Sequence, residues 1–280
     1  MITEQQATLK DKVRFSGVGI HTGEQASVTV YPAPENSGRR FLVDGVDFPA
    51  RIDHVLSCDR CTVLGKGEVR VHTPEHLLAA LAGLGIDNAV MEMDGPEVPI
   101  LDGGSIEFCE AFQAVGIETQ KAPAKYLKPD RPYSVRQDNG ALVLVTPSEF
   151  PVYEYILHYD HPMIGCQTAE FRPAEDDFAT QIAPARTFAL WEEVKPLIER
   201  GLGQGGHADN CLVIFQDHFS TPLKVENEPV RHKCLDLIGD FGLLDARIQA
   251  RVLAVKAGHA LHVDCARIVW EEMLVAHECP

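Results

Sequence analysis

The chain is short of positive charge and of long hydrophobic runs. Its 280 residues contain 25 Lys and Arg against 41 Asp and Glu, a formal net charge of −16. Nucleic acids and anionic lipid surfaces both need a basic face. The most apolar stretch, residues 77–86, is about half of the ~20 residues that a membrane-spanning helix needs. We therefore expect no nucleic-acid partner and no stable membrane insertion.

Signals of secretion are also missing. Residues 1–6 show neither the basic nor the apolar segment of a signal peptide. Eight cysteines in a chain of this length are too few for a disulfide scaffold. Cys58 and Cys61 have C-x-x-C spacing, but a structural zinc site would need a second such pair, which the sequence lacks. We expect a cytoplasmic protein with free thiols.

The order of strands and helices predicts an α+β fold in two domains. A stretch rich in Lys and Pro, residues 120–132, separates domains at residues 1–122 and 123–280. Alternation over residues 26–30 predicts a strand, and residues 141–145 and 152–157 predict a hairpin. A short helix over 191–200 and a glycine-rich turn over 201–206 follow. Strands precede a helix in each half, which favours α+β over a regular βαβ alternation.

A buried helix beginning near residue 74 carries the first candidate site residues. Thr73 is a good N-cap and Pro74 suits the first helical position. Glu75 and His76 then stand at the helix N-terminus, where a carboxylate can accept a proton and an imidazole can bind a metal. His72 and His76 are four residues apart, but the helix begins between them, so we expect no helical pair.

A second helix, expected over residues 229–244, carries a polar row. His232 and Asp236 are spaced i, i+4, so their side chains lie one above the other, and Asp240 continues the row one turn further. The row borders the apolar stripe and should be partly buried. Gly239 allows a close approach, and Lys233 offers a cation to an anionic substrate.

These residues and a third histidine together favour a metal site. His259 follows Gly258 at the end of an expected strand and could act as an acid beside carboxylates. Two imidazoles and one carboxylate, from His76, His232 and Asp236, are a typical ligand set of catalytic zinc. The same set is typical of non-haem Fe(II) oxygenases, and a non-catalytic binding module is a third possibility.

Five ordered motifs resemble one enzyme family. They are residues 17–23 (GVGIHTG), 72–88 (HTPEHLLAALAGLGIDN), 185–188 (ARTF), 227–240 (NEPVRHKCLDLIGD) and 258–261 (GHAL). Together they span nearly the whole chain and resemble the UDP-3-O-acyl-N-acetylglucosamine deacetylases, zinc hydrolases of lipid A biosynthesis in Gram-negative bacteria. The resemblance implies zinc-dependent hydrolysis of the N-acetyl group of UDP-3-O-(3-hydroxyacyl)-N-acetylglucosamine, with release of acetate.

The resemblance also implies a fold and an assembly state. It implies two similar α+β domains packed as a sheet–helices–sheet sandwich, each with a small insert. The second insert, at about residues 189–219, would line an apolar passage for the acyl chain of the substrate. We expect the protein to be a monomer.

The roles of individual residues are likewise implied by the resemblance. Zinc would be held by His76, His232 and Asp236. Glu75 would be the general base and His259 the catalytic histidine. Asp240 would hydrogen-bond His259 and keep it protonated, and the Thr187 hydroxyl would help to hold the oxyanion. Lys233 and Lys256 would lie near the diphosphate. The remaining residues expected to contact the substrate are Phe188, Tyr159, Ile20 and Cys61.

Three residues depart from the pattern of the family. Pro74 replaces the usual Val, which suits a helix start. His207 replaces a Ser in the second insert, where it affects the expected acyl-chain preference. His262 replaces the Asn that normally follows the GHAL motif, and we expect it to change the hydrogen bonding around His259.

Overall fold

Two five-stranded sheets repeat one topology in the computed structural model, which describes residues 4–199 and 203–278. The first sheet has the order β2 (Val13–Val18), β3 (Gln25–Pro32), β9 (Ala89–Asp94), β4 (Arg39–Val43) and β5 (Val46–Pro49). The second has the order β12 (Tyr133–Arg136), β13 (Leu142–Pro147), β19 (Ala250–Val255), β14 (Val152–His158) and β15 (Cys166–Phe171). In both sheets the third and fourth strands pair in parallel and every other pair is antiparallel.

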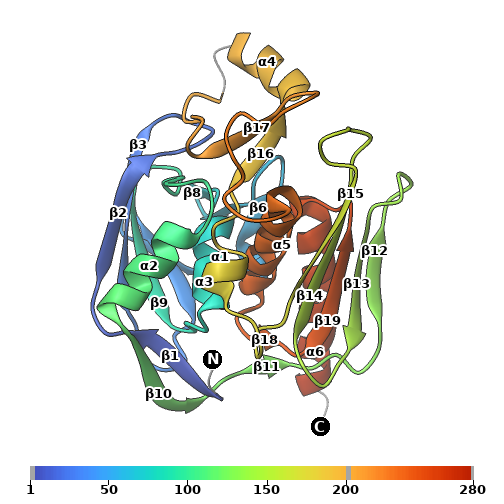
Figure 1. Cartoon of the computed structure of the whole chain (residues 1–280). Helices are drawn as coiled ribbons and strands as arrows, with labels where there is room; N and C mark the ends of the chain where they lie inside the picture. Colours follow the sequence, from blue (N-terminus) through green and yellow to red (C-terminus); the bar gives the residue numbers. More distant parts are fainter. Residues whose placement is uncertain (1–3, 200–202, 279–280) are drawn as a thin grey trace.

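The helices fill the space between these sheets. Figure 1 shows α1 (Glu75–Gly83) and α5 (Glu228–Phe241) between the two sheets, with α2 (Ile106–Val115) and α3 (Phe178–Gln181) beside α1. The single-turn 3-10 helix η2 (Gly242–Leu244) follows α5 directly, and α5 packs on β14 and β15. The long α6 (His259–Glu278) packs on β12 and β13. These layers confirm the predicted α+β fold.

The two central helices approach very closely at one glycine. A Cβ placed on Gly239 of α5 would lie 2.2 Å from the carbonyl oxygen of Glu75 on α1. Only a residue without a side chain is tolerated at such a crossing. The close approach that the sequence suggested at Gly239 therefore brings the N-terminus of α1 against the last turn of α5.

Smaller elements extend each half. In the first half, the 3-10 helix η1 (Ile52–His54) precedes a three-stranded sheet of β6 (Val55–Ser57), β7 (Val63–Lys66) and β8 (Val69–His72). In the second, β16 (Thr187–Leu190) and β17 (Cys211–Ile214) pair in parallel around α4 (Trp191–Glu199). This unit overlaps the insert expected at 189–219, which stays a prediction, and α4 matches the helix expected at 191–200. Arg200 and the first two residues of the expected glycine-rich turn lie outside the described residues.

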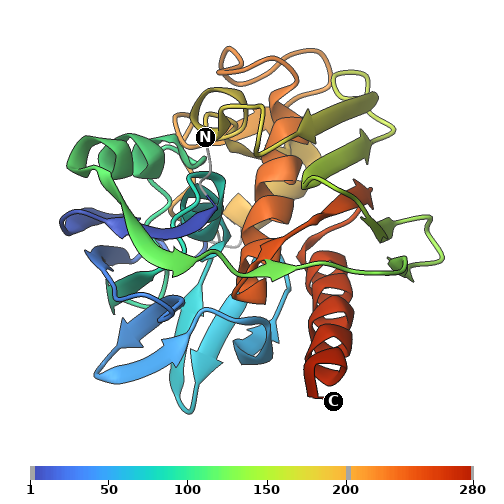
Figure 2. The ribbon, with the colours of Figure 1, turned by 90° about the horizontal axis from the view of Figure 1, so that it is seen from below.

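The chain passes once from the first half to the second along the lower edge in Figure 1. β1 (Gln5–Leu9) pairs with β10 (Ile117–Pro123), and β11 (Tyr126–Leu127) pairs with β18 (Arg247–Ile248). Figure 2 shows this crossing from below. It falls in the stretch expected as a boundary, and the domain bounds 1–122 and 123–280 stay a prediction.

The predicted hairpin over residues 141–157 is wrong. β19 lies between β13 and β14, antiparallel to the first and parallel to the second. Val252 and Ala254 of β19 are fully buried, so this distant strand contributes core side chains at the centre of the sheet. The Pro147–Pro151 loop therefore joins two strands that are not neighbours.

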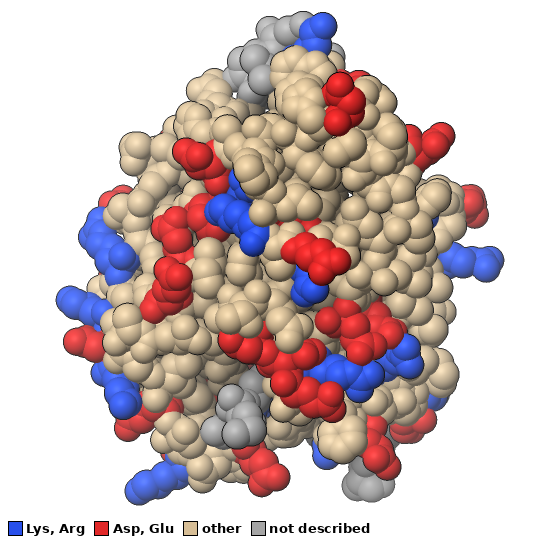
Figure 3. Space-filling model, viewed as in Figure 1, with Lys and Arg blue, Asp and Glu red and all other residues tan. Residues whose placement is uncertain are grey.

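The structure also describes the cysteine thiols, the charge on one face and the longest helices. Cys58 and Cys61 are free thiols. On the face in Figure 3, acidic and basic side chains are interspersed, without a continuous basic patch among the residues drawn in colour. Within residues 4–199 and 203–278, no helix is both long and apolar enough to cross a membrane.

Candidate active site

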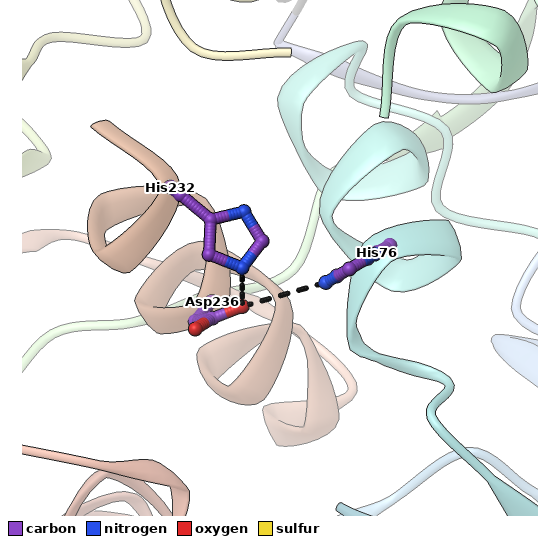
Figure 4. Close-up of side chains that lie close together, drawn as sticks. All are labelled: His76, His232 and Asp236. Carbon is purple, nitrogen blue, oxygen red and sulfur yellow. Dashed lines mark ion pairs between the residues drawn. The ribbon is translucent and has the colours of Figure 1, made fainter. Parts of the chain in front are cut away.

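Three potential metal ligands converge between α1 and α5. His232 Nε2 lies 3.4 Å and His76 Nε2 lies 3.6 Å from the same oxygen, Oδ1 of Asp236. Figure 4 shows the two imidazoles facing this oxygen from different helices. All three side chains are buried. His72 ends β8, before the helix begins, so the prediction that it forms no helical pair with His76 is confirmed.

The chemistry of this cluster suits a divalent cation. Asp236 Oδ1 is buried and has no hydrogen-bond partner among the described residues. His232 Nδ1 lies 3.1 Å from the carbonyl oxygen of Ala185, which acts as acceptor and leaves Nε2 unprotonated toward Asp236. Burial lowers the pKa of His232 to about 3, so the ring is neutral. A buried carboxylate oxygen without a donor is costly unless a cation binds it, and two His with one carboxylate is a zinc ligand set.

Glu75 lies beside this cluster, and the pKa of its carboxyl is raised. It is 2% exposed, and burial raises its pKa to about 7 against the opposing charges of His259 and His76. Its Oε1 lies 3.7 Å from Nε2 of His259. A carboxyl that exchanges a proton near neutral pH is suited to general base catalysis.

A second buried cluster surrounds Asp240, one turn further along α5. Its Oδ2 accepts hydrogen bonds from Nδ1 of His259 at 2.8 Å and from Nδ1 of His262 at 2.9 Å. Its Oδ1 accepts from the hydroxyl of Thr62 at 2.7 Å. Burial disfavours the charged form of His259, but Asp240 and Glu75 outweigh it and raise the pKa of His259 to about 10. His259 is therefore a cation at neutral pH.

A family comparison agrees with this arrangement. The model of the family described as UDP-3-O-acyl N-acetylglycosamine deacetylase matches residues 6–271. The chain belongs to this family.

Individual relatives cover almost the same length. The chain is 41% identical to the UDP-3-O-acyl-N-acetylglucosamine deacetylase of Trichormus variabilis, over 94% of this chain and 97% of the relative. It is 39% identical to the enzyme of the same name from Chlamydia felis, over 98% and 99%. The corresponding protein of an Anaeromyxobacter species is 38% identical, over 94% and 88%.

Three of the residues that the resemblance placed at the substrate lie together beside the candidate metal ligands. The ring of Phe188, on β16, has its centroid 6.3 Å from that of His232 and 6.1 Å from that of Tyr159. The Lys233 ammonium lies 5.6 Å from the centre of the Phe188 ring and 2.8 Å from Oδ2 of Asp236. The structure thus forms an aromatic wall with one cation next to the cluster.

Cys61 and Ile20 approach the site from the first half of the chain. Cys61 is buried, and burial, followed by the charge of Glu75, raises the pKa of its thiol to about 12. The loop holding Ile20 packs against the second insert, because a Cβ on Gly205 would lie 2.1 Å from the carbonyl oxygen of Gly19 and 3.0 Å from Ile20 Cα. Their contacts with substrate stay predictions.

Thr187 and Lys256 are placed less directly. Thr187 begins β16, and its backbone N–H donates to the carbonyl of Gly103 at 2.8 Å. Lys256 is exposed three residues before His259, and its ammonium donates to the carbonyl of Asn139 at 3.3 Å. Among the described residues no hydrogen bond or ion pair joins Lys256 to Lys233 or to the cluster, so its role at a diphosphate stays a prediction.

The expected N-cap of α1 is wrong. The helix begins at Glu75 with Pro74 at the N-cap and no side-chain cap, while Thr73 has a φ of 53°. The Thr73 hydroxyl instead donates to Glu97 at 2.8 Å. A buried carboxylate needs several donors, and Glu97 also accepts from the backbone N–H groups of His21 and Thr22.

Sequence reasoning therefore missed Glu97 as the residue that ties the loop at residues 19–23 to the start of α1. The available signal was an acidic residue within the mostly apolar stretch 96–101. Thr62, which donates to Asp240, carried no comparable signal in its neighbours.

Proposed function

We propose that this protein hydrolyses the N-acetyl group of UDP-3-O-(3-hydroxyacyl)-N-acetylglucosamine in lipid A biosynthesis, with zinc as the metal. The observation that carries the proposal is the buried, unpartnered oxygen of Asp236 facing His76 and His232, in a chain that belongs to the deacetylase family. Bound there, zinc would polarise the acetamide carbonyl and lower the pKa of the attacking water.

The residues around the cluster would divide the proton transfers between them. Glu75, at the edge of the cluster, accepts the proton of the attacking water at its carboxylate. The His259 imidazolium, charged by Asp240, stabilises the negative charge that develops on the carbonyl oxygen, together with the Thr187 hydroxyl. The leaving amine takes its proton from the Glu75–His259 pair, and acetate and a free glucosamine amine result.

The UDP end and the acyl chain of the substrate would bind to separate surfaces. Lys233 supplies local positive charge for the diphosphate, although the whole chain carries a net charge of −16. Phe188 and the β16–α4–β17 unit form the apolar side, with Tyr159 for the nucleobase. Each methylene of an acyl chain buried there would contribute about 0.8 kcal/mol.

The test is acetate release from the acylated UDP-sugar by the zinc-loaded protein. Glu75→Ala should lower kcat/KM by at least about a hundredfold, because the general base is lost, while the zinc content stays unchanged. The matched control is Glu68→Ala, since Glu68 is an exposed glutamate between β7 and β8. It should retain full activity.

Two results would contradict the proposal. If the Glu75→Ala variant keeps the wild-type rate within about twofold, Glu75 is not the base. Substrate-coupled turnover of 2-oxoglutarate with Fe(II), without acetate release, would instead indicate an oxygenase built on the same ligands.

Location and assembly belong to the same proposal. We place the reaction in the cytoplasm and expect a monomer, because the site draws on residues of one chain. Cell fractionation and light scattering of the zinc-loaded protein check these two points.

A further inference from the structure

The departure from the family pattern at His262 lies directly behind the catalytic histidine. His262 is in the first turn of α6 and is fully buried. Its Nδ1 lies 2.9 Å from Oδ2 of Asp240, the same oxygen that accepts from His259 at 2.8 Å. One carboxylate oxygen therefore serves two imidazoles that are three residues apart.

The surroundings of His262 fix it as a neutral hydrogen-bond donor. Its Nε2 is buried and has no partner among the described residues. The Tyr155 ring packs edge to face against it, with centroids 6.0 Å apart. A protonated ring would bury a second N–H without an acceptor, which is costly, and burial lowers the pKa of His262. The ring therefore donates through Nδ1–H and carries no charge.

This donor completes the set that holds Asp240 in place. With His259 and Thr62, His262 gives the carboxylate three hydrogen bonds on its two oxygens. The negative charge is then shared with one cation, His259, whose Nε2 lies 3.7 Å from Glu75 Oε1. We propose that His262 is a positioning residue, whose neutral N–H fixes the plane of Asp240 so that His259 faces the reacting atoms. This inference rests on the proposed function.

The usual Asn can supply the same donor. The amide nitrogen of Asn and Nδ1 of His are the same number of bonds from Cα, so either can donate to Asp240. The rest of the imidazole adds only packing volume. Donation and packing can thus be removed separately, by His262→Phe and His262→Asn.

The experiment measures kcat, KM, zinc content and Tm of both variants in zinc-loaded protein. His262→Phe keeps the ring and removes the donor, and it should lower kcat about tenfold with KM within about twofold. His262→Asn should rescue most of kcat while lowering Tm, because it leaves a cavity. The matched control is Val269→Ala, a buried residue two turns further along α6, which should lower Tm without changing kcat.

The opposite pattern overturns the inference. If His262→Phe retains the wild-type kcat while His262→Asn loses it, the ring acts through packing alone. Equal loss of kcat in both variants with loss of zinc likewise contradicts a positioning role. Failure of the proposed function is distinguishable, since the wild-type protein would then release no acetate.

Discussion

Asp236 and Asp240 lie one turn apart on the same face of α5, yet their hydrogen-bond partners differ. Asp236 presents an oxygen without a donor to two imidazole nitrogens at 3.4 and 3.6 Å. Asp240 accepts three hydrogen bonds of 2.7–2.9 Å. In the first environment Oδ1 has no donor, although Oδ2 accepts from the Lys233 ammonium at 2.8 Å. In the second environment both carboxylate oxygens accept hydrogen bonds. In our proposal the same pairing of His with Asp therefore forms a metal site at Asp236 and a hydrogen-bonded, proton-holding site at Asp240.

The difference arises from which imidazole nitrogen faces the carboxylate. His232 donates through Nδ1–H to the carbonyl of Ala185, so its unprotonated Nε2 faces Asp236. His259 and His262 enter from the first turn of α6 and present Nδ1 to Asp240. Groups outside the helix, the Ala185 carbonyl beside one carboxylate and the α6 imidazoles beside the other, thus decide the chemistry of each carboxylate.

The largest expected effect comes from Asp236→Asn, which removes a ligand from the first site. Zinc affinity should fall at least about a hundredfold, because an amide is a much poorer ligand than a carboxylate. Competition with a chelator measures this loss, and acetate release should fall with it. Asp44→Asn, in the exposed β4–β5 turn, is the matched control. Undiminished zinc affinity in the Asp236→Asn variant would remove the distinction between the two carboxylates.

Asp240→Asn should separate the two sites in the other direction. Without the carboxylate, the protonated form of His259 loses the group that stabilises it most, so kcat should fall about a hundredfold. Zinc per chain should stay at the wild-type value, as measured by elemental analysis. A variant that lost zinc together with activity would show that both carboxylates belong to one metal site.

The pH dependence of folding should single out His259 in the metal-free protein. Its folded pKa of about 10 lies above the ordinary 6.5, so the folded state binds this proton more tightly than the unfolded state. The resulting stability is fully present below about pH 6.5 and is lost as the pH rises through about 10. The Tm advantage of wild type over His259→Gln should therefore be largest near pH 6 and vanish above about pH 10. If the Tm advantage of the wild type instead grows with pH, the pKa of His259 is not raised in the folded state, and the assignment of His259 as a cation is wrong.

The smallest effect is expected from Thr62→Val, which keeps the shape of the side chain and removes one donor to Asp240. The other two donors stay in place, so the free energy of unfolding should fall by about 1–2 kcal/mol. Activity should fall only a few fold. Urea unfolding and kcat measure the two quantities. A loss of kcat as large as that of Asp240→Asn would place Thr62 in direct contact with the reacting atoms.

Sequence spacing predicts what lies on one helix but not what folds against it. The i, i+4 row of His232, Asp236 and Asp240 follows from helical periodicity, and Gly239 indicates the close approach. The groups that distinguish the two carboxylates are the Ala185 carbonyl, which accepts from His232, and the Thr62 hydroxyl, which donates to Asp240. Both are distant in sequence from α5 and have no local pattern.

The fold shows the same division. Periodicity located both central helices and most of the strand positions discussed, and the order of elements indicated the α+β class. The pairing of β13 and β14 was wrong because β19, about a hundred residues later, takes the place between them. The Thr73 cap was wrong because Glu97, from a distant loop, takes its hydroxyl.

The most direct test of the account is anomalous diffraction at the zinc edge from crystals of the zinc-loaded protein. The account predicts one peak about 2.1 Å from Nε2 of His76, Nε2 of His232 and Oδ1 of Asp236. A peak among Asp240, His259 and His262 instead, with the first site unoccupied, would contradict it.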